Sequence, residues 1–244
     1  MSSSQRVPQL TIDHGLRADR LRDGTIEVVG RLVEASNMTL YCDLGDGDHC
    51  VYKPVRGERP LDDFPGGTLA FREVAAFEVS EAAGWRIVPP TVLRDGPLGP
   101  GMVQWWVDVD PEANILEMIL TRDQRLRPMA LFDAVVNNAD RKGGHLLPTD
   151  DGHLYGCDHG VCFAIDPKLR SVLWGWRGEK LTAQERACLR DVRALLRGPL
   201  RQRLSELLSP EEVDATDHRV ADLLQSDRLP LPAAYRPAIP WPPF

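Results

Sequence analysis

Alternating apolar and polar positions dominate the first part of the chain. Residues 25–34 (TIEVVGRLVE) and 38–44 (MTLYCDL) alternate and are rich in β-branched and aromatic side chains, which is typical of strands. A third alternating run, 49–55 (HCVYKPV), follows the turn signal Gly45-Asp46-Gly47-Asp48. Together these runs predict a three-stranded antiparallel meander. Residues 1–20 are polar and are expected to form a loose N-terminal segment.

The pattern then changes to one helix followed by two further strands. Thr68 is expected to cap a helix that stops at Gly84, since Thr is a favoured N-cap and Gly a favoured stop residue. Residues 85–92 and 102–107 are apolar and extended in pattern, so they are expected to form a fourth and a fifth strand. A sheet with one inserted helix predicts a small N-terminal lobe over residues 21–108.

Helical periodicity is typical of the second half, which predicts a mostly helical lobe over residues 109–228. The expected helices cover residues 115–120, 128–138, 182–196, 200–208 and 210–225. One short β-hairpin is expected between them, with strands at 145–147 and 153–157. Residues 229–244 contain six prolines and are expected to be an extended strap or a loose end.

The register of the first hairpin determines which side chains accompany Lys53. A turn that pairs Leu44 with His49 would place on one face the residues Leu40, Cys42, Val51 and Lys53. An ammonium on an apolar face is unfavourable unless an anion meets it. Glu73, in the apolar part of the next helix, is the expected partner. A purely structural lysine pair and a solvated Glu73 remain the alternatives.

Two acidic residues stand at the ends of the expected hairpin in the second half. Asp140 follows a helical run and opens a glycine-rich loop, and Asp158 follows the return strand. The return strand should bring Asp158 back beside Asp140 and His145. A cluster of two carboxylates and an imidazole at a strand end is suited to hold a divalent metal and to orient a hydroxyl.

Composition narrows the class of protein. A chain of 244 residues with 43% hydrophobic residues can build one large domain or two lobes that share a cleft. A net charge of −7 argues against a general nucleic-acid partner, which would require a basic face. No apolar run reaches the length of about 18 residues that would span a bilayer, so no membrane insertion is expected.

Residues 1–10 and the cysteines bear on the compartment. Residues 1–10 contain no apolar stretch, so no signal peptide is expected. The five cysteines are odd in number and include no C-x-x-C pair, which favours reduced thiols. A cytoplasmic location is therefore expected.

Four candidate residues stand in the order Lys53, Glu73, Asp140 and Asp158. They lie in the motifs Tyr52-Lys53-Pro54, Phe71-Arg72-Glu73, Asn138-Ala139-Asp140-Arg141 and Asp158-His159-Gly160. With these motifs in this order, the chain resembles protein-kinase-like phosphotransferases of the lipid-kinase and HipA branch. It is identified as a member of an actinobacterial phosphatidylinositol 3-/4-kinase-like family over residues 25–208. The resemblance implies an α+β, two-lobed kinase-like fold, with an N-terminal antiparallel sheet plus one helix and a mostly helical C-terminal lobe.

The resemblance also implies catalytic roles. Lys53, steadied by Glu73, would pair with the phosphates of ATP. Asp140 would orient the attacking hydroxyl and accept its proton, and Asp158 would hold Mg²⁺ or Mn²⁺. The acceptor would be a hydroxyl of a protein or small molecule, with residues 168–176 as the docking region for a protein.

Further residues are implied to contact the nucleotide. The turn residues Ser36 and Asn37 would cover the phosphates with backbone N–H groups. The roof of the adenine pocket would be formed by Leu40, Cys42 and Val51, and the backbone from Gln104 through Trp105 and Trp106 to Val107 would meet the adenine edge.

One departure from the family pattern leaves the activity open. His145 stands where the family has an asparagine that binds a second metal ion. His145 could hold a metal ion such as Mn²⁺, hydrogen-bond a phosphate, or mark a weakened kinase. A nucleotide-binding pseudokinase that acts as a regulator or scaffold is therefore one alternative function. A protein nucleotidyltransferase on the same fold is another.

Overall fold

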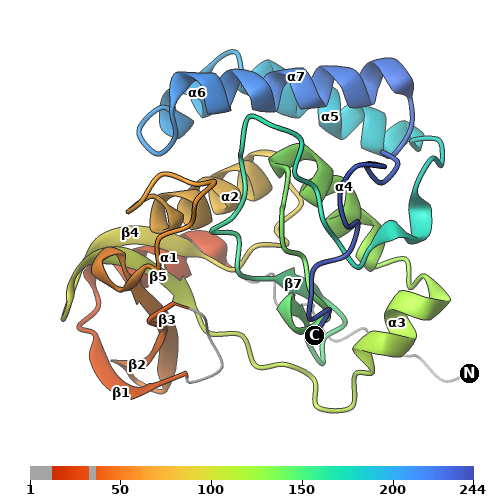
Figure 1. Cartoon of the computed structure of the whole chain (residues 1–244). Coiled ribbons are helices and arrows are strands. Elements are labelled where there is room, and N and C mark those ends of the chain that lie inside the picture. The colour runs from red at the N-terminus through yellow and green to blue at the C-terminus, as the bar shows by residue number, and fades with distance from the viewer. Residues whose placement is uncertain (1–12, 33–36) are drawn as a thin grey trace, which may run out of the picture.

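The computed structural model describes residues 13–32 and 37–244. Its first half is built on a five-stranded antiparallel sheet (Figure 1) with the spatial order β1-β2-β3-β5-β4. The strands are β1 (Glu27–Arg31), β2 (Leu40–Gly45), β3 (Asp48–Pro54), β4 (Thr91–Gly96) and β5 (Gly99–Trp105). The fourth strand begins later than predicted, because Pro89 and Pro90 have no N–H for a sheet ladder.

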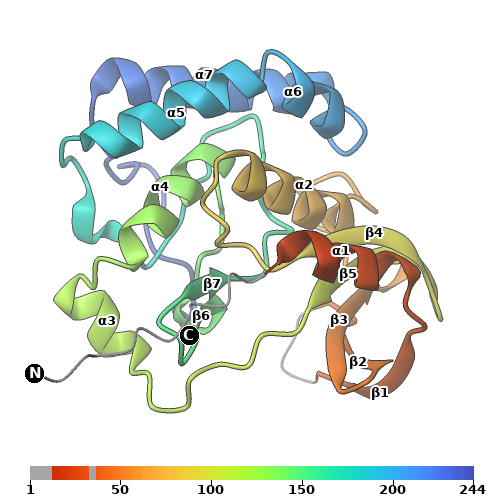
Figure 2. The same ribbon diagram turned by 180° about the vertical axis from the view of Figure 1, so that it is seen from behind.

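Helices cover both faces of this sheet. Helix α2 (Leu69–Ala82) belongs to the large core that continues into the second half of the chain. Helix α1 (His14–Asp23) lies across β4 and β5 (Figure 2) and buries Ala18 and Leu21 in a separate cluster. The prediction of a loose segment up to residue 20 is therefore wrong from residue 14 onward. The sequence gives a weak helix signal there, because α1 buries few side chains.

The predicted register of the β2–β3 hairpin is wrong by one residue. Cys42 lies opposite Cys50 rather than Val51, and Leu40 lies opposite Tyr52 rather than Lys53. The hairpin closes through Asp46 and Gly47, both at positive φ, and an irregularity between Asp43 and Gly45 absorbs one residue. A slip of one residue moves every side chain to the other face. Leu40 and Cys42 therefore point toward the α1 side of the sheet, away from Lys53.

The N-terminus of α2 is capped differently from the prediction. Thr68 makes no side-chain cap and donates its hydroxyl to Pro65 O instead. The carboxylate of Glu58 accepts from the N–H groups of Leu69 (3.2 Å) and Ala70 (2.9 Å). At the other end the helix stops at Gly84, which has φ +66°, as predicted.

The second half is mostly helical, as predicted. It contains α3 (Ile115–Thr121), α4 (Leu126–Val136), α5 (Ala183–Leu195), α6 (Pro199–Leu204) and α7 (Pro210–Ser226), with 3₁₀ turns η2 (Gly143–His145) and η3 (Trp174–Trp176). A third 3₁₀ turn, η1 (Val55–Gly57), follows β3. The short hairpin consists of β6 (Leu146–Pro148) and β7 (Leu154–Gly156), so His145 lies in the 3₁₀ turn before the first strand. The chain is thus an α+β protein, with a sheet followed by a helical part.

One core joins the two halves. Residues of α2 such as Val74 and Phe77 are buried in the same cluster as Phe132 of α4 and Leu189 of α5. This packing fixes α2, which carries Glu73, against the part of the chain that carries Asp140 and Asp158. Among the residues that the structure describes, no helix combines the length and the apolar character needed to cross a bilayer.

Candidate active site

Lys53 joins two acidic residues that are distant in sequence. It projects from β3, and its Nζ lies 2.6 Å from Oε1 of Glu73 on α2. The same Nζ lies 2.7 Å from Oδ1 of Asp158, which follows β7. Glu73 is buried, whereas the side chain of Asp158 is 48% exposed. The structure thus brings three of the predicted residues together, with Asp158 on the open side.

Charge pairing and burial set the protonation states of this group. The ammonium of Lys53 holds the pKa of Asp158 far below its usual range. Burial acts to lower the pKa of Lys53, but the carboxylates of Asp158 and Glu73 outweigh it and raise that pKa. Burial raises the pKa of Glu73, against the opposing effect of Lys53. At neutral pH Lys53 is therefore a cation and Asp158 an anion.

The backbone of Asp158 is held in an unusual conformation. Its φ is +61°, in the left-handed region that few residues other than glycine adopt. The next N–H, that of His159, donates to Oε2 of Glu73 at 2.8 Å. Glu73 therefore positions Asp158 twice, through Lys53 and through this backbone bond. Backbone strain of this kind is frequent at functional sites.

His145 lies on the other side of Asp158. Its Nε2 is 3.3 Å from Oδ2 of Asp158, and its Nδ1 accepts from the N–H of Lys142 at 3.4 Å. Burial lowers the pKa of His145 to about 4, so the ring is neutral at pH 7. Because Nδ1 accepts a hydrogen bond, the proton of the neutral ring is assigned to Nε2 and is directed at Asp158. In this state His145 orients the carboxylate of Asp158.

Asp140 lies in the loop that precedes η2. Its N–H donates to Oδ1 of Asn138 (2.9 Å), and its Oδ2 lies 3.4 Å from Nζ of Lys142. Burial raises the pKa of Asp140, and Lys142 opposes this effect. A carboxylate with a raised pKa is better suited to accept a proton.

The role of Lys142 beside Asp140 was not predicted from the sequence. The available signal was its position, two residues after Asp140, in a chain that has only four lysines.

Arg141 holds the loop and the Asp158 segment together. Its side chain is fully buried and donates to both carboxylate oxygens of Asp133 on α4. It also donates to Cys157 O (2.9 Å) and lies 2.6 Å from Nε2 of His159. Asp133 was missed in the sequence, although an aspartate inside the apolar stripe of a predicted helix is a signal for a buried partner.

The predicted adenine contacts are only partly in place. Val51 faces Gln104 across β3 and β5, on the same side of the sheet as Lys53, whereas Leu40 and Cys42 lie on the opposite side. Gln104 is buried, and its amide donates to Thr91 at 2.9 Å. The prediction that Leu40 and Cys42 form the roof of the adenine pocket is therefore wrong.

Two backbone N–H groups of the segment 104–107 already donate hydrogen bonds within the protein. The N–H of Trp105 donates to Pro90 O (2.8 Å), and that of Trp106 donates to His49 O (3.0 Å). The ring of Trp105 lies beneath the guanidinium of Arg17, on the α1 side. Neither of these two N–H groups is free for an adenine edge, which leaves the carbonyl groups and Val107 as candidates.

The predicted phosphate-covering turn is described only at its second residue. Ser36 lies outside the described residues. Oδ1 of Asn37 accepts from the N–H of Arg59 at 2.8 Å, so this side chain ties the turn to the loop before α2.

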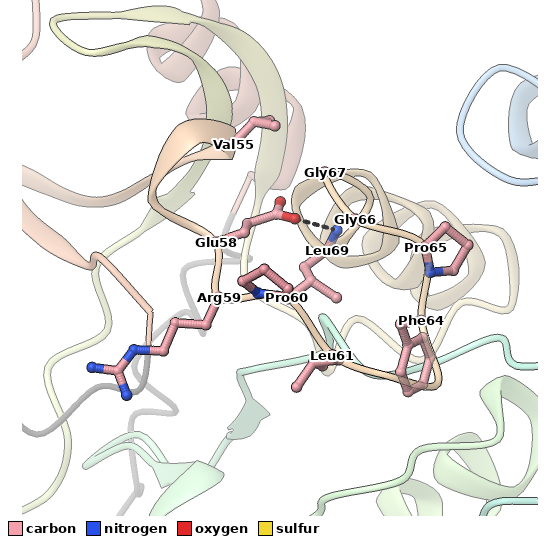
Figure 3. A pocket seen from close by; sticks show the side chains of 10 residues that line it. All are labelled: Val55, Glu58, Arg59, Pro60, Leu61, Phe64, Pro65, Gly66, Gly67 and Leu69. Carbon is pink, nitrogen blue, oxygen red and sulfur yellow. Dashed lines mark hydrogen bonds between the residues drawn. The ribbon is translucent and has the colours of Figure 1, made fainter.

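A small pocket lies beside that loop (Figure 3), next to the N-terminus of α2 rather than at the Lys53 site. It is bordered by Glu58, Phe64, Gly67 and Leu69. The carboxylate of Glu58 already occupies the N–H groups at the start of the helix. The start of α2 is therefore capped from within the chain, and these two N–H groups are not open to a ligand in the pocket.

The donor set fits a metal ion that is held jointly with phosphates. Within residues 13–32 and 37–244, no three His, Cys, Asp or Glu side chains are grouped to bind a metal ion by themselves. Asp158 offers an ionised, half-exposed carboxylate, which is the hard ligand that Mg²⁺ and Mn²⁺ prefer. Such ions commonly take one or two protein carboxylates and obtain their other ligands from phosphates and water.

Solved structures with the same fold include two of the Golgi casein kinase and one of a hydra protein. The Golgi casein kinase with Mn/ADP bound aligns with a TM-score of 0.60 at 14% identity, over 87% of this chain and 75% of that chain. Another Golgi casein kinase structure gives a TM-score of 0.53 at 14% identity, over 87% and 74%. The hydra Fam20 structure with sugar gives 0.50 at 14% identity, over 86% of both chains. The predicted protein-kinase-like fold is thereby confirmed, whereas the narrower phosphatidylinositol 3-/4-kinase-like grouping stays a prediction.

Sequence comparison gives a closer relationship. No protein-family model matches the chain. Protein Rv2133c of Mycobacterium tuberculosis (strain ATCC 25618 / H37Rv) is 42% identical over 262 aligned positions, which cover 92% of this chain and 94% of that protein. Identity at this level over nearly the whole of both chains shows that this protein, with its kinase-like fold, belongs to the family of Rv2133c.

Proposed function

We propose that the protein is an ATP- and divalent-metal-dependent phosphotransferase that acts on a hydroxyl group. The observation that carries the proposal is the position of Lys53 between Glu73 and Asp158, with Asp140 in the neighbouring loop. Phosphoryl transfer needs a cation for the phosphates, a carboxylate for the metal ion and a carboxylate near the attacking hydroxyl. Lys53, Asp158 and Asp140 are the residues that we propose for these roles, and the contacts of each support the assignment.

Lys53 would exchange partners when a nucleotide binds. Its ammonium now satisfies two carboxylates, of which Glu73 is buried and Asp158 is half exposed. Phosphate oxygens would replace Asp158 as the open-side partner, while Glu73 keeps Lys53 in place. Asp158 would then be free to hold the cation, with His145 steadying its second oxygen. A bound Mg²⁺ or Mn²⁺ would neutralise phosphate charge and orient the phosphates for displacement.

Asp140 would act on the acceptor. Its carboxylate would accept the proton of the acceptor hydroxyl while that oxygen forms a bond to the γ-phosphorus. The bond from the γ-phosphorus to the bridging oxygen breaks, and ADP leaves. Lys142, 3.4 Å from Asp140, would stabilise the negative charge on the transferred group. The Golgi casein kinase, which shares the fold, was solved with Mn and ADP, and this supports the choice of cofactors.

Transfer from ATP labelled at the γ-phosphate tests the proposal. The protein is incubated with Mg²⁺ or Mn²⁺, and turnover and self-phosphorylation are measured. The wild-type chain should show metal-dependent transfer, and Asp140→Asn should lose it. Asp150→Asn, an exposed position in the turn between β6 and β7, is the matched control and should retain it. A wild-type chain without transfer, or an Asp140→Asn chain with full transfer, contradicts the proposal.

A nucleotide-binding pseudokinase is the second candidate. It is favoured by His145, which takes the place of a metal-binding asparagine and directs its Nε2 toward Asp158. ATP binding without any turnover would select this function. AMP rather than phosphate found on a target protein would instead select the nucleotidyltransferase.

A further inference from the structure

The proline-rich segment 236–244 lies against the loop that contains Asp140 and Gly143. In Figure 1 the dark blue end of the chain runs down from α7 to the β6–β7 hairpin. The N–H of Gly143, in η2, donates to Pro243 O at 2.8 Å. A Cβ atom on Gly143 would overlap the ring of Phe244, so the segment approaches the loop as closely as a glycine permits.

The same segment also crosses residues 170–174. The N–H of Ser171 (3.0 Å) and Nε1 of Trp174 (2.9 Å) both donate to Ala238 O. A guanidinium nitrogen of Arg170 reaches Ile239 O at 3.5 Å. We call the surface made by Gly143, Arg170, Ser171 and Trp174 the strap groove.

Two backbone hydrogen bonds connect the strap groove to the loop that contains Asp140. The N–H of Arg170 donates to Asn138 O (2.9 Å), and the N–H of Arg141 donates to Arg170 O (3.0 Å). These two bonds lie on either side of Asp140 in the sequence. Any chain in the strap groove is therefore held next to the loop that presents Asp140.

The strap groove contacts the main chain of its occupant. All four donors bind main-chain carbonyl groups, which every peptide carries. Pro240 is the buried residue of the segment, whereas Ile239 and Trp241 on either side are 49% and 86% exposed. The side chain at position 240 thus points inward. Residues 236–244 contain no Ser, Thr or Tyr, so the present occupant has no hydroxyl to receive a phosphoryl group.

We propose that the strap groove is the acceptor site for a peptide segment, and that residues 236–244 occupy it as an intramolecular pseudosubstrate. The proposal rests on the proposed phosphotransferase function and narrows its acceptor to a protein segment. Four donors that bind main-chain carbonyl groups in the segment next to Asp140 are suited to a peptide backbone and not to a small sugar or a lipid headgroup. The segment must leave before another peptide can enter.

Peptide binding tests the groove without ATP or metal. A fluorescent peptide of residues 236–244 is titrated into the full chain and into a chain that lacks those residues. A tethered segment competes at an effective concentration of the order of millimolar. The shortened chain should therefore bind the peptide at least about tenfold more tightly than the full chain. Equal binding by both chains, or none by either, overturns the proposal.

A second variant covers the case in which the shortened chain does not fold. Phe244→Ala loosens the contact with Gly143 in the full chain and should increase binding of the peptide. Trp241→Ala changes an exposed ring and is the matched control, which should leave binding unchanged. Equal binding by these two variants also overturns the proposal.

A serine placed in the segment tests the link to Asp140. Pro240→Ser puts a hydroxyl at the buried position, and Trp241→Ser puts one at an exposed position. With ATP and Mn²⁺, Ser at 240 should gain phosphate at a rate independent of protein concentration, and Ser at 241 should not. If a variant chain transfers phosphate to other acceptors, phosphate on both introduced serines or on neither contradicts the pseudosubstrate proposal. A chain that binds the peptide but neither binds ATP nor transfers phosphate instead contradicts the proposed function.

Discussion

The ammonium of Lys53 lies 2.7 Å from the carboxylate of Asp158, a residue 105 positions further along the chain. Glu73 holds the same ammonium at 2.6 Å from the buried side. Asp158 is the half-exposed partner, so it is the one that an incoming anion can replace. Under the proposed function, a phosphate oxygen would take the place of Asp158 as the second anionic partner of Lys53.

Lys53→Met should weaken nucleotide binding by about tenfold or more, because a charge-assisted hydrogen bond contributes about 1.5 to 3 kcal/mol. Lys180→Met removes an exposed lysine and should leave the affinity unchanged. Isothermal titration with an ATP analogue and Mn²⁺ measures both variants. Equal affinities would show that Lys53 does not meet the phosphates.

Glu73→Gln should also weaken nucleotide binding, since it removes the buried charge that steadies Lys53 and alters the bond to His159 N. Glu78→Gln is the control on the same helix, because Glu78 pairs with Arg203 at a partly exposed position. The same titration applies. A larger loss of nucleotide affinity in Glu78→Gln than in Glu73→Gln would show that the phosphates do not bind at Lys53.

Arg141→Leu should lower the free energy of unfolding by about 3 to 5 kcal/mol, because it leaves the buried Asp133 carboxylate without its cationic partner. Arg197→Leu breaks a pair with Asp217 in which the arginine is 59% exposed, and it should cost less than about 1 kcal/mol. Urea denaturation measures both values. Similar losses would mean that Arg141 does not organise the loop.

The acidic limb of the pH–activity profile should depend on Asp140. A general base must be ionised, and burial raises the pKa of Asp140, so activity should fall at a higher pH than for an ordinary aspartate. Lys142→Met removes a charge that lowers this pKa, and the limb should move to higher pH. Rate measurements from pH 4 to 8, with Lys180→Met as control, test this. An acidic limb that stays in place, or moves to lower pH, would show that Lys142 does not lower the pKa of Asp140.

The sequence predicted the contacts that depend on element order and on strong chemistry. Lys53 on a strand and Glu73 inside an apolar helix were enough to expect their ion pair. The direct contact between Lys53 and Asp158 was not predicted. The register of β2 and β3 was missed, because the extra residue between Asp43 and Gly45 is decided by local turn geometry.

Two further features depend on tertiary contacts, one between residues eight positions apart and one between distant segments. Arg141 and Asp133 become partners only when α4 packs beneath the loop. The seating of residues 236–244 on Gly143 joins parts of the chain separated by about a hundred positions. Proline content indicated an extended strap, but no sequence pattern shows what the strap covers.

Metal-dependent stabilisation by ATP, compared between the wild-type chain and Asp158→Asn, tests the proposed nucleotide and metal site. At about a hundredfold excess over Kd, a ligand stabilises the folded state by about 2.7 kcal/mol. For a chain of this size that corresponds to a rise in Tm of about 5 to 10 °C. We predict this rise for the wild-type chain with ATP and Mg²⁺ or Mn²⁺ together, and its loss in Asp158→Asn. No rise in the wild-type chain, or an equal rise in the variant, would contradict a nucleotide–metal site at Lys53 and Asp158.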